Sequence, residues 1–325
     1  IIAQYLPEQL SEAELKKMIA DAIAETNAAG PAGMGLVMKV LQPKIAGKAD
    51  GGLVSGLVKA ALAEDLAGGV DVTSVATIAA DAELKAEFVA RESGVVVGIE
   101  MAKAVLAEVG VAGIEVLVQD GASVKAGDVL IKVTGNARAI LLAERTALNF
   151  LGHLSGIATL TNQWVKAIAG TKCEIRDTRK TTPGWRELEK FAVHMGGGTN
   201  HRMSLSDAAL IKDNHIAAAG GVKAAFNAVR SAFPTAPIEI EVDTLEQLAE
   251  VLPLKPDLVL LDNMTPEQCR SAVSIVAGQT KLEASGGITL DKARSYAETG
   301  VDFLAIGALT HSAKNFDIGL DVRSK

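Results

Sequence analysis

The stretch IEIEVDTLEQLAEVLPLKPDLVLLD at residues 238–262 has a short β-branched run, IEIEV, and a short apolar run, LVLLD, on either side of a segment with a helical pattern. Apolar, β-branched runs of about four to eight residues are typical of buried strands. A strand, a helix and a second strand in succession predict a βα unit in which the two strands run parallel. The stretch therefore indicates a parallel sheet covered by helices.

The same alternation continues on both sides of this stretch. The predicted strands are 173–177, 208–211, 238–242, 258–262, 282–285 and 303–306. Helical patterns at 219–231, 244–252, 265–277 and 289–298 separate most of them. A repeat of this kind predicts a parallel β/α barrel, which we assign to residues 172–325.

The sequence before residue 172 has a different organisation. Short β-branched runs bounded by glycine predict strands near 88–90, 95–97 and 129–131, and residues 137–169 predict one long helix. We expect residues 57–171 to form an α/β sandwich domain whose long helix leads into the barrel. A carrier domain for biotin or lipoate has a similar rhythm, but its modified lysine lies at a hairpin tip that we do not find here.

Residues 1–56 predict a helical segment. Ser11 followed by Glu14 is a capping box, Pro31 suits the first turn of a second helix, and Asp50 could cap a third. We expect this third helix to carry Leu53, Leu57 and Ala61. The simplest interpretation is a small helical bundle with no chemistry of its own.

Composition narrows the function classes. The chain has 325 residues, of which 49% are hydrophobic, 22% charged and 3% aromatic, and its net charge is 32 − 39 = −7. These values exclude a mainly disordered chain, and they argue against a basic nucleic-acid-binding coat and against a base-stacking platform. No apolar run reaches the length of a membrane span. Cys173 and Cys269 lie far apart, and we interpret them as reduced thiols of a cytoplasmic protein.

Polar and glycine residues follow the predicted barrel strands, where β/α barrels carry their chemistry. In chain order they are Arg179 and Lys180, Lys212, Glu241, Asp262, the run Ser285, Gly286 and Gly287, and Gly307. The two glycine loops predict a monophosphate site, because glycine lets backbone N–H groups approach a phosphate. Together with His201 and Arg202, the cations match a substrate with several negative charges.

Two features leave alternatives open. Glu241 and Asp262 end apolar strands and need a partner, which is a sugar hydroxyl, Mg²⁺ or a salt bridge to Lys180 or Lys212. Arg145 shares an apolar helical stripe with Leu141 and Leu148, so its guanidinium needs an acid or an anion. Alternatively, Arg145 forms a salt bridge to Glu144, or its aliphatic part packs on the stripe while its guanidinium stays in solvent.

Long motifs resemble the quinolinate phosphoribosyltransferase family over about residues 57–325. They are EDLAGGVDVTS (64–74), ARESGVVVG (90–98), AERTALNFLGHLSGIAT (143–159), DTRKTTPGWRELEKFAV (177–193), GGGTNHRMSLSDAALIKDNHI (196–216), IEIEV (238–242), LVLLDNM (258–264), LEASGGIT (282–289) and FLAIGALTHSA (303–313). The segment AGGVDVTS and the pair His194 and Met195 depart from the family pattern. Residues 5–15, 23–26 and 34–62 resemble the YqeY family, which is related to the tail domain of the amidotransferase GatB.

The resemblance implies a reaction that joins quinolinate to phosphoribosyl pyrophosphate, giving nicotinate mononucleotide, pyrophosphate and CO₂ for NAD biosynthesis. It implies Mg²⁺ as cofactor and a homodimer in which Arg145 reaches the partner's site. The implied quinolinate ligands are Arg145, Arg179, His201, Arg202 and Lys212. Lys180 contacts the pyrophosphate-bearing substrate, Glu241 and Asp262 bind ribose hydroxyls directly or through Mg²⁺, and Ser285, Gly286, Gly287 and Gly307 hold the 5′-phosphate. Lys180, Lys212, Glu241 and Asp262 form the implied catalytic group.

Three other functions compete with this one. A phosphoribosyltransferase for nicotinate itself needs fewer cations. A barrel isomerase or aldolase for a sugar phosphate needs a lone Schiff-base lysine, whereas Lys212 lies among cations. A binding module would use the first 60 residues to contact transfer RNA or an amidotransferase, but they lack a dense basic stripe. We interpret His153 and His311 as packing or capping residues.

Overall fold

The computed structural model describes residues 51–323. The predictions for residues 1–50, among them the capping box at Ser11 and the helix after Pro31, lie outside the described residues. Within the described part, no helix has the length and apolarity needed to cross a membrane.

Helix α4, Gly51–Leu66, confirms the third predicted N-terminal helix. Val58 and Leu62 are buried where α4 packs against helices α6, Ile99–Glu108, and α7, Ala137–Ala167. Helix α5, Val72–Thr77, follows, and the Asp71 side chain caps it by accepting from the Ser74 N–H at 3.0 Å. Residues 51–66 are therefore part of the main core.

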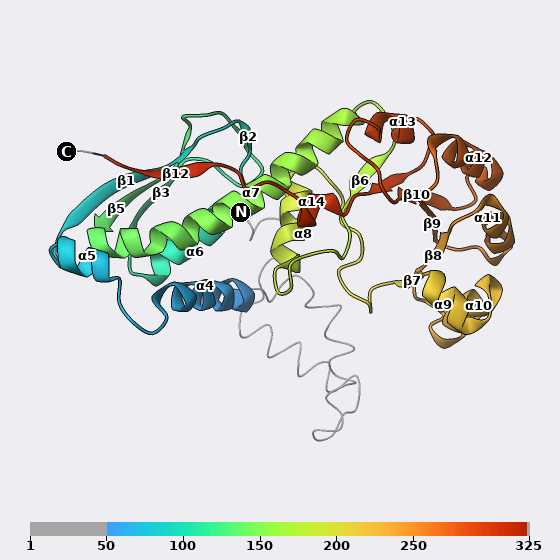
Figure 1. Cartoon of the computed structure of the whole chain (residues 1–325), viewed down its shortest axis with the longest axis horizontal. Helices are drawn as coiled ribbons and strands as arrows, with labels where there is room; N and C mark the ends of the chain where they lie inside the picture. Colours follow the sequence, from blue (N-terminus) through green and yellow to red (C-terminus); the bar gives the residue numbers. More distant parts are fainter. Residues whose placement is uncertain (1–50, 324–325) are drawn as a thin grey trace, which may run out of the picture.

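An antiparallel sheet forms the first half of the molecule (Figure 1). Its strand order is β12-β1-β5-β3, with bounds β1 Glu83–Ala90, β3 Gly113–Val116, β5 Val129–Asn136 and β12 Ile318–Val322. The two short strands β2, Gly94–Val95, and β4, Ser123–Val124, pair separately. Strand β12 has no counterpart in the sequence prediction. It comes from the far end of the chain and pairs with β1, with Leu320 opposite Phe88, so only tertiary contact reveals it.

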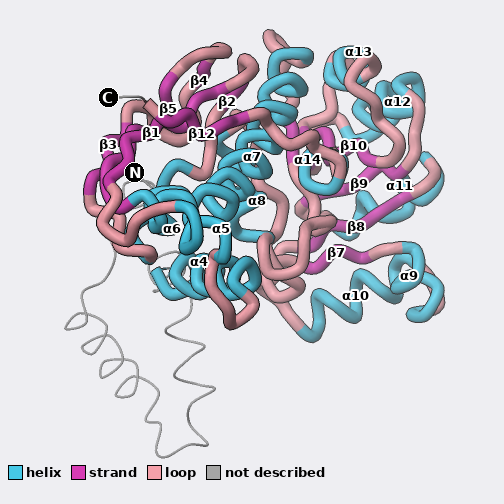
Figure 2. The backbone as a smooth tube through the Cα atoms, turned by 60° about the vertical axis from the view of Figure 1, so that its left-hand side comes forward, coloured by secondary structure: helices cyan, strands magenta, loops and turns pink. Residues whose placement is uncertain are grey.

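Helix α7 joins the two halves (Figure 2). It confirms the predicted long helix, and its N-cap is Asn136, whose side chain accepts from the Ala139 N–H at 3.2 Å. Gly156 lets the chain near Lys314 cross the helix closely, because a Cβ at this position would lie 2.1 Å from the Lys314 carbonyl oxygen. We call residues 51–171, which contain most of the antiparallel sheet together with α4, α5, α6 and α7, the antiparallel layer.

The second half is a parallel β/α barrel of six strands with order β6-β11-β10-β9-β8-β7. The strands are β6 Glu174–Arg176, β7 Ala209–Ile211, β8 Ile238–Val242, β9 Leu258–Asp262, β10 Lys281–Ser285 and β11 Phe303–Ala305. All six predicted strands are confirmed. The barrel is open at one seam, because β6 and β7 do not pair with each other.

Helices cover the barrel between its strands. They are α8 Arg186–Met195, α9 Asp213–Ala219, α10 Val222–Ala232, α11 Leu245–Val251, η2 Leu252–Leu254, α12 Pro266–Val276, α13 Ala293–Ala297 and α14 Ala308–His311. The helix predicted over 219–231 begins at Val222 instead, because Gly220 and Gly221, with φ angles of 83° and 137°, separate α10 from α9, a short helix that the sequence did not predict. The helix predicted over 289–298 is shorter than expected and begins after a turn at Lys292.

Candidate active site

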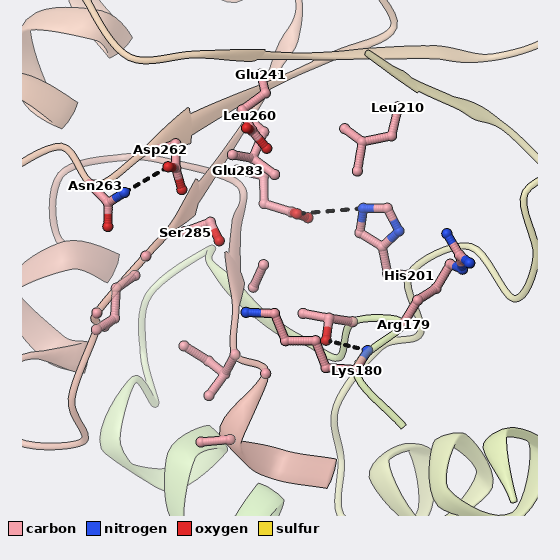
Figure 3. A pocket seen from close by; sticks show the side chains of 18 of the residues that line it. Arg179, Lys180, His201, Leu210, Glu241, Leu260, Asp262, Asn263, Glu283 and Ser285 are labelled. Atoms are coloured by element: carbon pink, nitrogen blue, oxygen red, sulfur yellow. Dashed lines mark hydrogen bonds and ion pairs between the residues drawn. The ribbon is translucent and has the colours of Figure 1, made fainter. Parts of the chain in front are cut away.

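The carboxyl ends of the barrel strands surround a cavity of about 820 Å³. Eleven of the twelve predicted site residues line it: Arg179, Lys180, His201, Arg202, Lys212, Glu241, Asp262, Ser285, Gly286, Gly287 and Gly307. Figure 3 shows Glu241 and Asp262 at one side of the cavity and Lys180 and Arg179 at the other. The fold thus brings cations, acids and a glycine loop from separate strand ends into one space.

The acidic side of the cavity holds two carboxylates, of which one is paired with a nearby cation and the other is not. Glu241 Oε2 lies 2.7 Å from Lys212 Nζ, so the salt bridge considered from the sequence is present. Asp262 forms no ion pair within 4 Å in the described part of the chain, and it accepts from Asn263 Nδ2 at 2.6 Å. Burial, reinforced by Asp243, raises the pKa of Asp262. Asp262 is therefore the acid that lacks a close countercharge.

This donor set fits Mg²⁺. The ion is commonly held by one or two carboxylates, with waters and substrate phosphates completing its shell. Glu241 and Asp262 come from the neighbouring strands β8 and β9 and line the same cavity. Asp262 offers a carboxylate that a cation would neutralise.

A second group, His201, Glu239 and Glu283, offers three ligand atoms within 4.8 Å of one another. Its hydrogen bonding does not suit a metal. His201 Nδ1 accepts from the Arg202 N–H at 2.8 Å, which places the ring proton on Nε2, the nitrogen that faces the two acids. A metal needs an unprotonated nitrogen at that position, so this group fits a cation less well than Glu241 and Asp262 do.

The cationic side is crowded. The Nε atoms of Arg179 and Arg202 are buried and have no hydrogen-bond partner. Burial, together with the nearby Arg179 guanidinium, lowers the pKa of Arg202. Unpartnered guanidinium donors are costly in a protein, and a carboxylate can accept from each guanidinium in a bidentate manner. This side of the cavity is built to receive an anion.

A buried carboxylate holds the two cationic segments together. Asp177 Oδ1 accepts from the His201 N–H at 2.8 Å and also from Lys190 Nζ on α8. The same Lys190 ammonium donates to the His201 carbonyl at 2.8 Å, and it is only 1% exposed. The segment with Arg179 and the segment with His201 therefore share one buried ion pair as their support.

The glycine loop is shaped by its neighbour Asn263. Gly286 has φ 90°, and a Cβ there would lie 2.1 Å from Asn263 Oδ1. Gly287 has φ 61°. In residues 51–323 the N–H groups of both glycines have no acceptor, so they can donate to a bound anion. Gly307, at the end of the next strand, packs against the Lys180 side chain. A Cβ at Gly307 would lie 3.0 Å from Lys180 Cδ.

The structure also adds residues that the sequence prediction did not name. Thr178, Asn263, Glu283 and His311 line the cavity. The sequence could have indicated Glu283 as a cavity residue, because Glu283 lies two residues before Ser285 on the same strand and therefore on the same face of the sheet. His311 was expected to pack or cap; it borders the cavity, and its Nδ1 lies 2.7 Å from Ser312 Oγ. His153 instead lies 2.9 Å from Glu189 Oε1, away from the cavity.

Arg145 is the one predicted residue outside the cavity. It is exposed on α7, and no hydrogen bond or ion pair joins it to any residue from 51 to 323. The alternative salt bridge to Glu144 is not formed there.

Comparison with known proteins gives consistent matches. The profile of the quinolinate phosphoribosyl transferase C-terminal domain matches residues 157–321, that of its N-terminal domain matches residues 71–155, and that of Yqey-like proteins matches residues 1–62. A nicotinate-nucleotide pyrophosphorylase (carboxylating) of Mycobacterium leprae is 52% identical over 271 residues, which cover 82% of this chain and 95% of that protein.

Two further relatives agree. A probable nicotinate-nucleotide pyrophosphorylase (carboxylating) of Bacillus subtilis is 41% identical over 266 residues, covering 80% of this chain and 90% of that protein. The solved structure of the nicotinate-nucleotide pyrophosphorylase from Francisella tularensis has a TM-score of 0.80 at 41% identity, and covers 83% of this chain and 96% of that one. With both domain profiles matched in order and the cavity at their expected strand ends, this chain belongs to the quinolinate phosphoribosyltransferase family and carries a Yqey-like segment at its beginning.

Proposed function

We propose that this protein transfers the phosphoribosyl group of phosphoribosyl pyrophosphate to quinolinate, with loss of CO₂. The products are nicotinate mononucleotide and pyrophosphate, and the reaction serves NAD biosynthesis. The observation that carries the proposal is the single cavity in which crowded guanidinium groups, free glycine N–H groups and two carboxylates meet. A diacid, a phosphate and a ribose present complementary groups to these three sets.

Quinolinate binds on the cationic side. Arg179 and Arg202 have buried donors without partners, and these suit the two carboxylates of the pyridine ring. Lys212 lies nearby on the strand end of β7, and His201 forms part of the wall. Gripping both carboxylates fixes the plane of the ring and directs its nitrogen toward the ribose C1.

Phosphoribosyl pyrophosphate spans the rest of the cavity, between the glycine loops, Lys180 and the two acids. Ser285, Gly286, Gly287 and Gly307 bind the 5′-phosphate, and the exposed Lys180 ammonium faces the pyrophosphate. Glu241 and Asp262 accept hydrogen bonds from the ribose hydroxyls or hold Mg²⁺. When bound, Mg²⁺ neutralises charge on the departing pyrophosphate.

The reaction follows from this placement. As the C1–oxygen bond to pyrophosphate breaks, its electron pair leaves with pyrophosphate and positive charge develops on the ribose. The Glu241 and Asp262 carboxylates stabilise that charge, while the aligned pyridine nitrogen forms the new bond to C1. The ring nitrogen is then quaternary, so the electron pair released when the adjacent carboxylate leaves as CO₂ can stay on C2, which takes up a proton. The chain needs no covalent nucleophile for these steps.

The direct test measures CO₂ and nicotinate mononucleotide formed from quinolinate, phosphoribosyl pyrophosphate and Mg²⁺. We expect turnover with quinolinate and none of comparable rate with nicotinate. Asp262→Asn and Lys212→Ala should each lower kcat/KM about 100-fold or more, because they remove charges at the reacting groups. Lys281→Ala is the matched control, since this exposed lysine lies at the opposite end of β10 beside Phe303. Turnover of nicotinate in place of quinolinate would contradict the proposal.

We also propose a homodimer with shared active sites, in which Arg145 acts on the partner's cavity. The support is that Arg145 is exposed, has no partner from residue 51 to 323, and lies outside its own cavity. Mixing Arg145→Ala chains with Lys212→Ala chains restores one intact site in each mixed dimer. Random assortment then gives about a quarter of the wild-type activity. Mixed dimers that form without recovering activity would contradict the shared site.

The Yqey-like segment is proposed as an accessory element, not as part of the catalytic unit. Helix α4 packs in the main core, so a deletion must end at residue 50 to leave the fold intact. We expect the shortened chain to keep wild-type kcat/KM. A loss of turnover would assign the segment to the enzyme, whereas a loss of transfer-RNA binding alone would assign it to an interaction.

A cytoplasmic location is the final part of the proposal. Cys173 and Cys269 are buried and unpaired. Burial raises their thiol pKa values to about 12 and about 11, which keeps both as unreactive thiols. Cell fractionation followed by immunoblotting tests this location, and recovery in a membrane or secreted fraction would contradict it.

A further inference from the structure

Charged side chains form part of the cavity floor and fill the barrel interior beneath it. Arg176 on β6, Glu283 on β10 and Glu239 on β8 come from alternate strands of the sheet. Barrel interiors are built in such layers, and bulky aliphatic residues usually fill them. Glu239 lies two residues before Glu241, and Glu283 two before Ser285, so this layer is one step below the substrate-facing one. We call Arg176, Glu239, Glu283 and the His201 ring that contacts them the charged layer.

The members of the charged layer contact one another. Arg176 Nη1 lies 2.8 Å from Glu283 Oε2. His201 Nε2 lies 2.8 Å from Glu239 Oε2 and 3.5 Å from Glu283 Oε1, the second contact being the dashed line to His201 in Figure 3. Glu283 is fully buried, and Glu239 is 5% exposed. Burying two acids costs free energy, and the proposed reaction makes no direct use of them.

The His201 ring is constrained at both nitrogens. Its Nδ1 accepts from the Arg202 N–H at 2.8 Å, so it carries no proton. The proton therefore lies on Nε2, which faces the two acids. The ring is a neutral imidazole of one defined tautomer, and its orientation is coupled to the backbone of Arg202, the residue whose guanidinium lines the cavity.

We propose that Glu239 and Glu283 are positioning residues of the transfer reaction, which hold the His201 imidazole as its Nε2–H tautomer and so fix His201 and Arg202 against the bound diacid. The placement of the diacid rests on the proposed function, whereas the state of the ring does not. We assign both acids a positioning role because their carboxylate oxygens face His201 Nε2; Glu283 borders the floor of the cavity, and Glu239 does not line it.

Charge balance supports this role. Burial and the guanidinium of Arg179 both disfavour the charged form of Arg202, and Glu239 opposes them by raising the pKa of Arg202. An acid below the cations therefore reduces their mutual repulsion while the cavity holds no anion. The cations stay in place before the substrate arrives, which lowers the cost of binding it.

Kinetics of paired variants test the proposal. Loss of a residue that orients a substrate-contacting group typically costs about 10- to 100-fold. We expect Glu239→Ala to raise the KM for quinolinate and lower kcat/KM by about this factor, with the KM for phosphoribosyl pyrophosphate unchanged. Glu239→Gln keeps an oxygen acceptor for Nε2–H and should recover most of the loss. Glu267→Ala removes an exposed glutamate of α12 and serves as the control.

A spectroscopic measurement reports directly which nitrogen of the His201 ring carries the proton. Histidine labelled with ¹⁵N shows which ring nitrogen carries the proton, and the His201 signals are identified by their absence in His201→Asn. We expect a protonated Nε2 and a bare Nδ1 in the wild type and in Glu239→Gln, and a mixture of tautomers in Glu239→Ala. If the Ala variant does not fold, the wild-type and Gln spectra still decide the state of the ring.

Several outcomes overturn the proposal. A wild-type His201 that is charged or carries its proton on Nδ1 contradicts the geometry. A wild-type pattern in Glu239→Ala shows that the acid does not hold the ring. If Glu239→Gln keeps the tautomer yet is as impaired as Glu239→Ala, the reaction needs the charge and not the orientation. A correct ring state without turnover of quinolinate would instead contradict the proposed function alone.

Discussion

The two halves of the molecule bury different chemistry. In residues 51–171 the buried polar side chains are hydroxyls: Ser74, Thr146, Ser155 and Thr161. In residues 172–323 they include seven titratable groups: Asp177, Glu189, Lys190, His201, Glu239, Glu241 and Glu283. Buried charges seldom stabilise a protein better than apolar residues of the same size. The buried polar groups of the antiparallel layer are therefore those expected of a structural core. The barrel interior instead contains buried charges that stability alone does not explain.

The two halves also differ in how completely their buried polar groups are hydrogen-bonded. Ser155 Oγ accepts from the Val97 N–H at 2.9 Å and donates to the Val97 carbonyl at 3.0 Å, so this hydroxyl is satisfied. In the barrel, Arg179 Nε, Glu239 Oε1 and Glu283 Oε1 are buried without hydrogen-bond partners. Unsatisfied groups beside a cavity are typical of a site that a ligand completes.

The sharpest test of this contrast is Lys190→Met. It removes the ammonium that pairs with Asp177 and leaves a buried carboxylate without a cation. We expect the free energy of unfolding to fall by about 3–5 kcal/mol, as measured by urea denaturation. The matched change in the antiparallel layer is Ser155→Ala, which should cost about 1 kcal/mol because only neutral hydrogen bonds are lost. Equal losses in the two variants would show that the two cores are not different in kind.

Replacing the charged layer with apolar residues separates stability from function. We expect the triple variant Arg176→Met, Glu239→Leu, Glu283→Leu to unfold at the same temperature as the wild type or higher, since no buried charge is left unpaired. Turnover should fall about 100-fold or more, which corresponds to about 2.7 kcal/mol in the activation free energy. Calorimetry and the CO₂ assay measure the two effects. A variant that is strongly destabilised would mean that the charged layer is structural.

Two glycines with similar backbone angles extend the comparison to the loops. Gly286 in the barrel has φ 90° and faces Asn263, whereas Gly127 between β4 and β5 has φ 93° and open space where a Cβ would lie. Gly127→Ala should cost about 1 kcal/mol from backbone strain. Gly286→Ala adds a steric clash and should cost about 2 kcal/mol in total, with a raised KM for phosphoribosyl pyrophosphate. Unchanged KM values in Gly286→Ala would remove the loop from the phosphate site.

Sequence reasoning recovers the strands and the cavity residues for a shared physical reason. Runs such as LVLLD are buried on both faces, so their apolar pattern is strong, and the residue that follows them must lie at the barrel rim. Nine residues predicted at strand ends consequently line one cavity, and His201 and Arg202, which follow no predicted strand, complete the set of eleven. The strand β12 escaped prediction because its pairing partner, β1, lies more than two hundred residues away in the chain.

The supporting charges were harder to predict. Lys190 and Glu239 look like ordinary surface charges in the sequence, on a helix and in the alternating run IEIEV. Only the structure shows that Lys190 is directed at Asp177 and that every residue of β8 is buried. A pattern of alternation assigns one face to solvent, and it fails where both faces of a strand are covered.

Asp120 provides the most specific test, because its carboxyl is an exception in the antiparallel layer, where the fully buried polar side chains are hydroxyls. Its Oδ1 accepts from the Gly98 and Ile99 N–H groups at 2.8 Å each, while its Oδ2 is buried without a partner. Burial raises the pKa of Asp120 to about 6. The folded state therefore binds a proton more tightly than the unfolded state, and this contribution to stability is lost as the pH rises from about 4 to about 6.

Asp120→Asn keeps an oxygen that can accept both backbone N–H groups and removes the titration. Between pH 4 and pH 6.5 we expect the free energy of unfolding of the wild type to fall relative to that of the variant by about 2 kcal/mol, because the pKa of Asp120 rises from its ordinary value to about 6 on folding. Comparing each protein with itself at the two pH values cancels any effect of the substitution that does not depend on pH, and groups elsewhere titrate equally in both. Parallel profiles would mean that the Asp120 carboxylate is solvated in the folded state. In that case burial would not destabilise the Asp120 carboxylate of the antiparallel layer, and the difference between this layer and the barrel in buried charge would be larger.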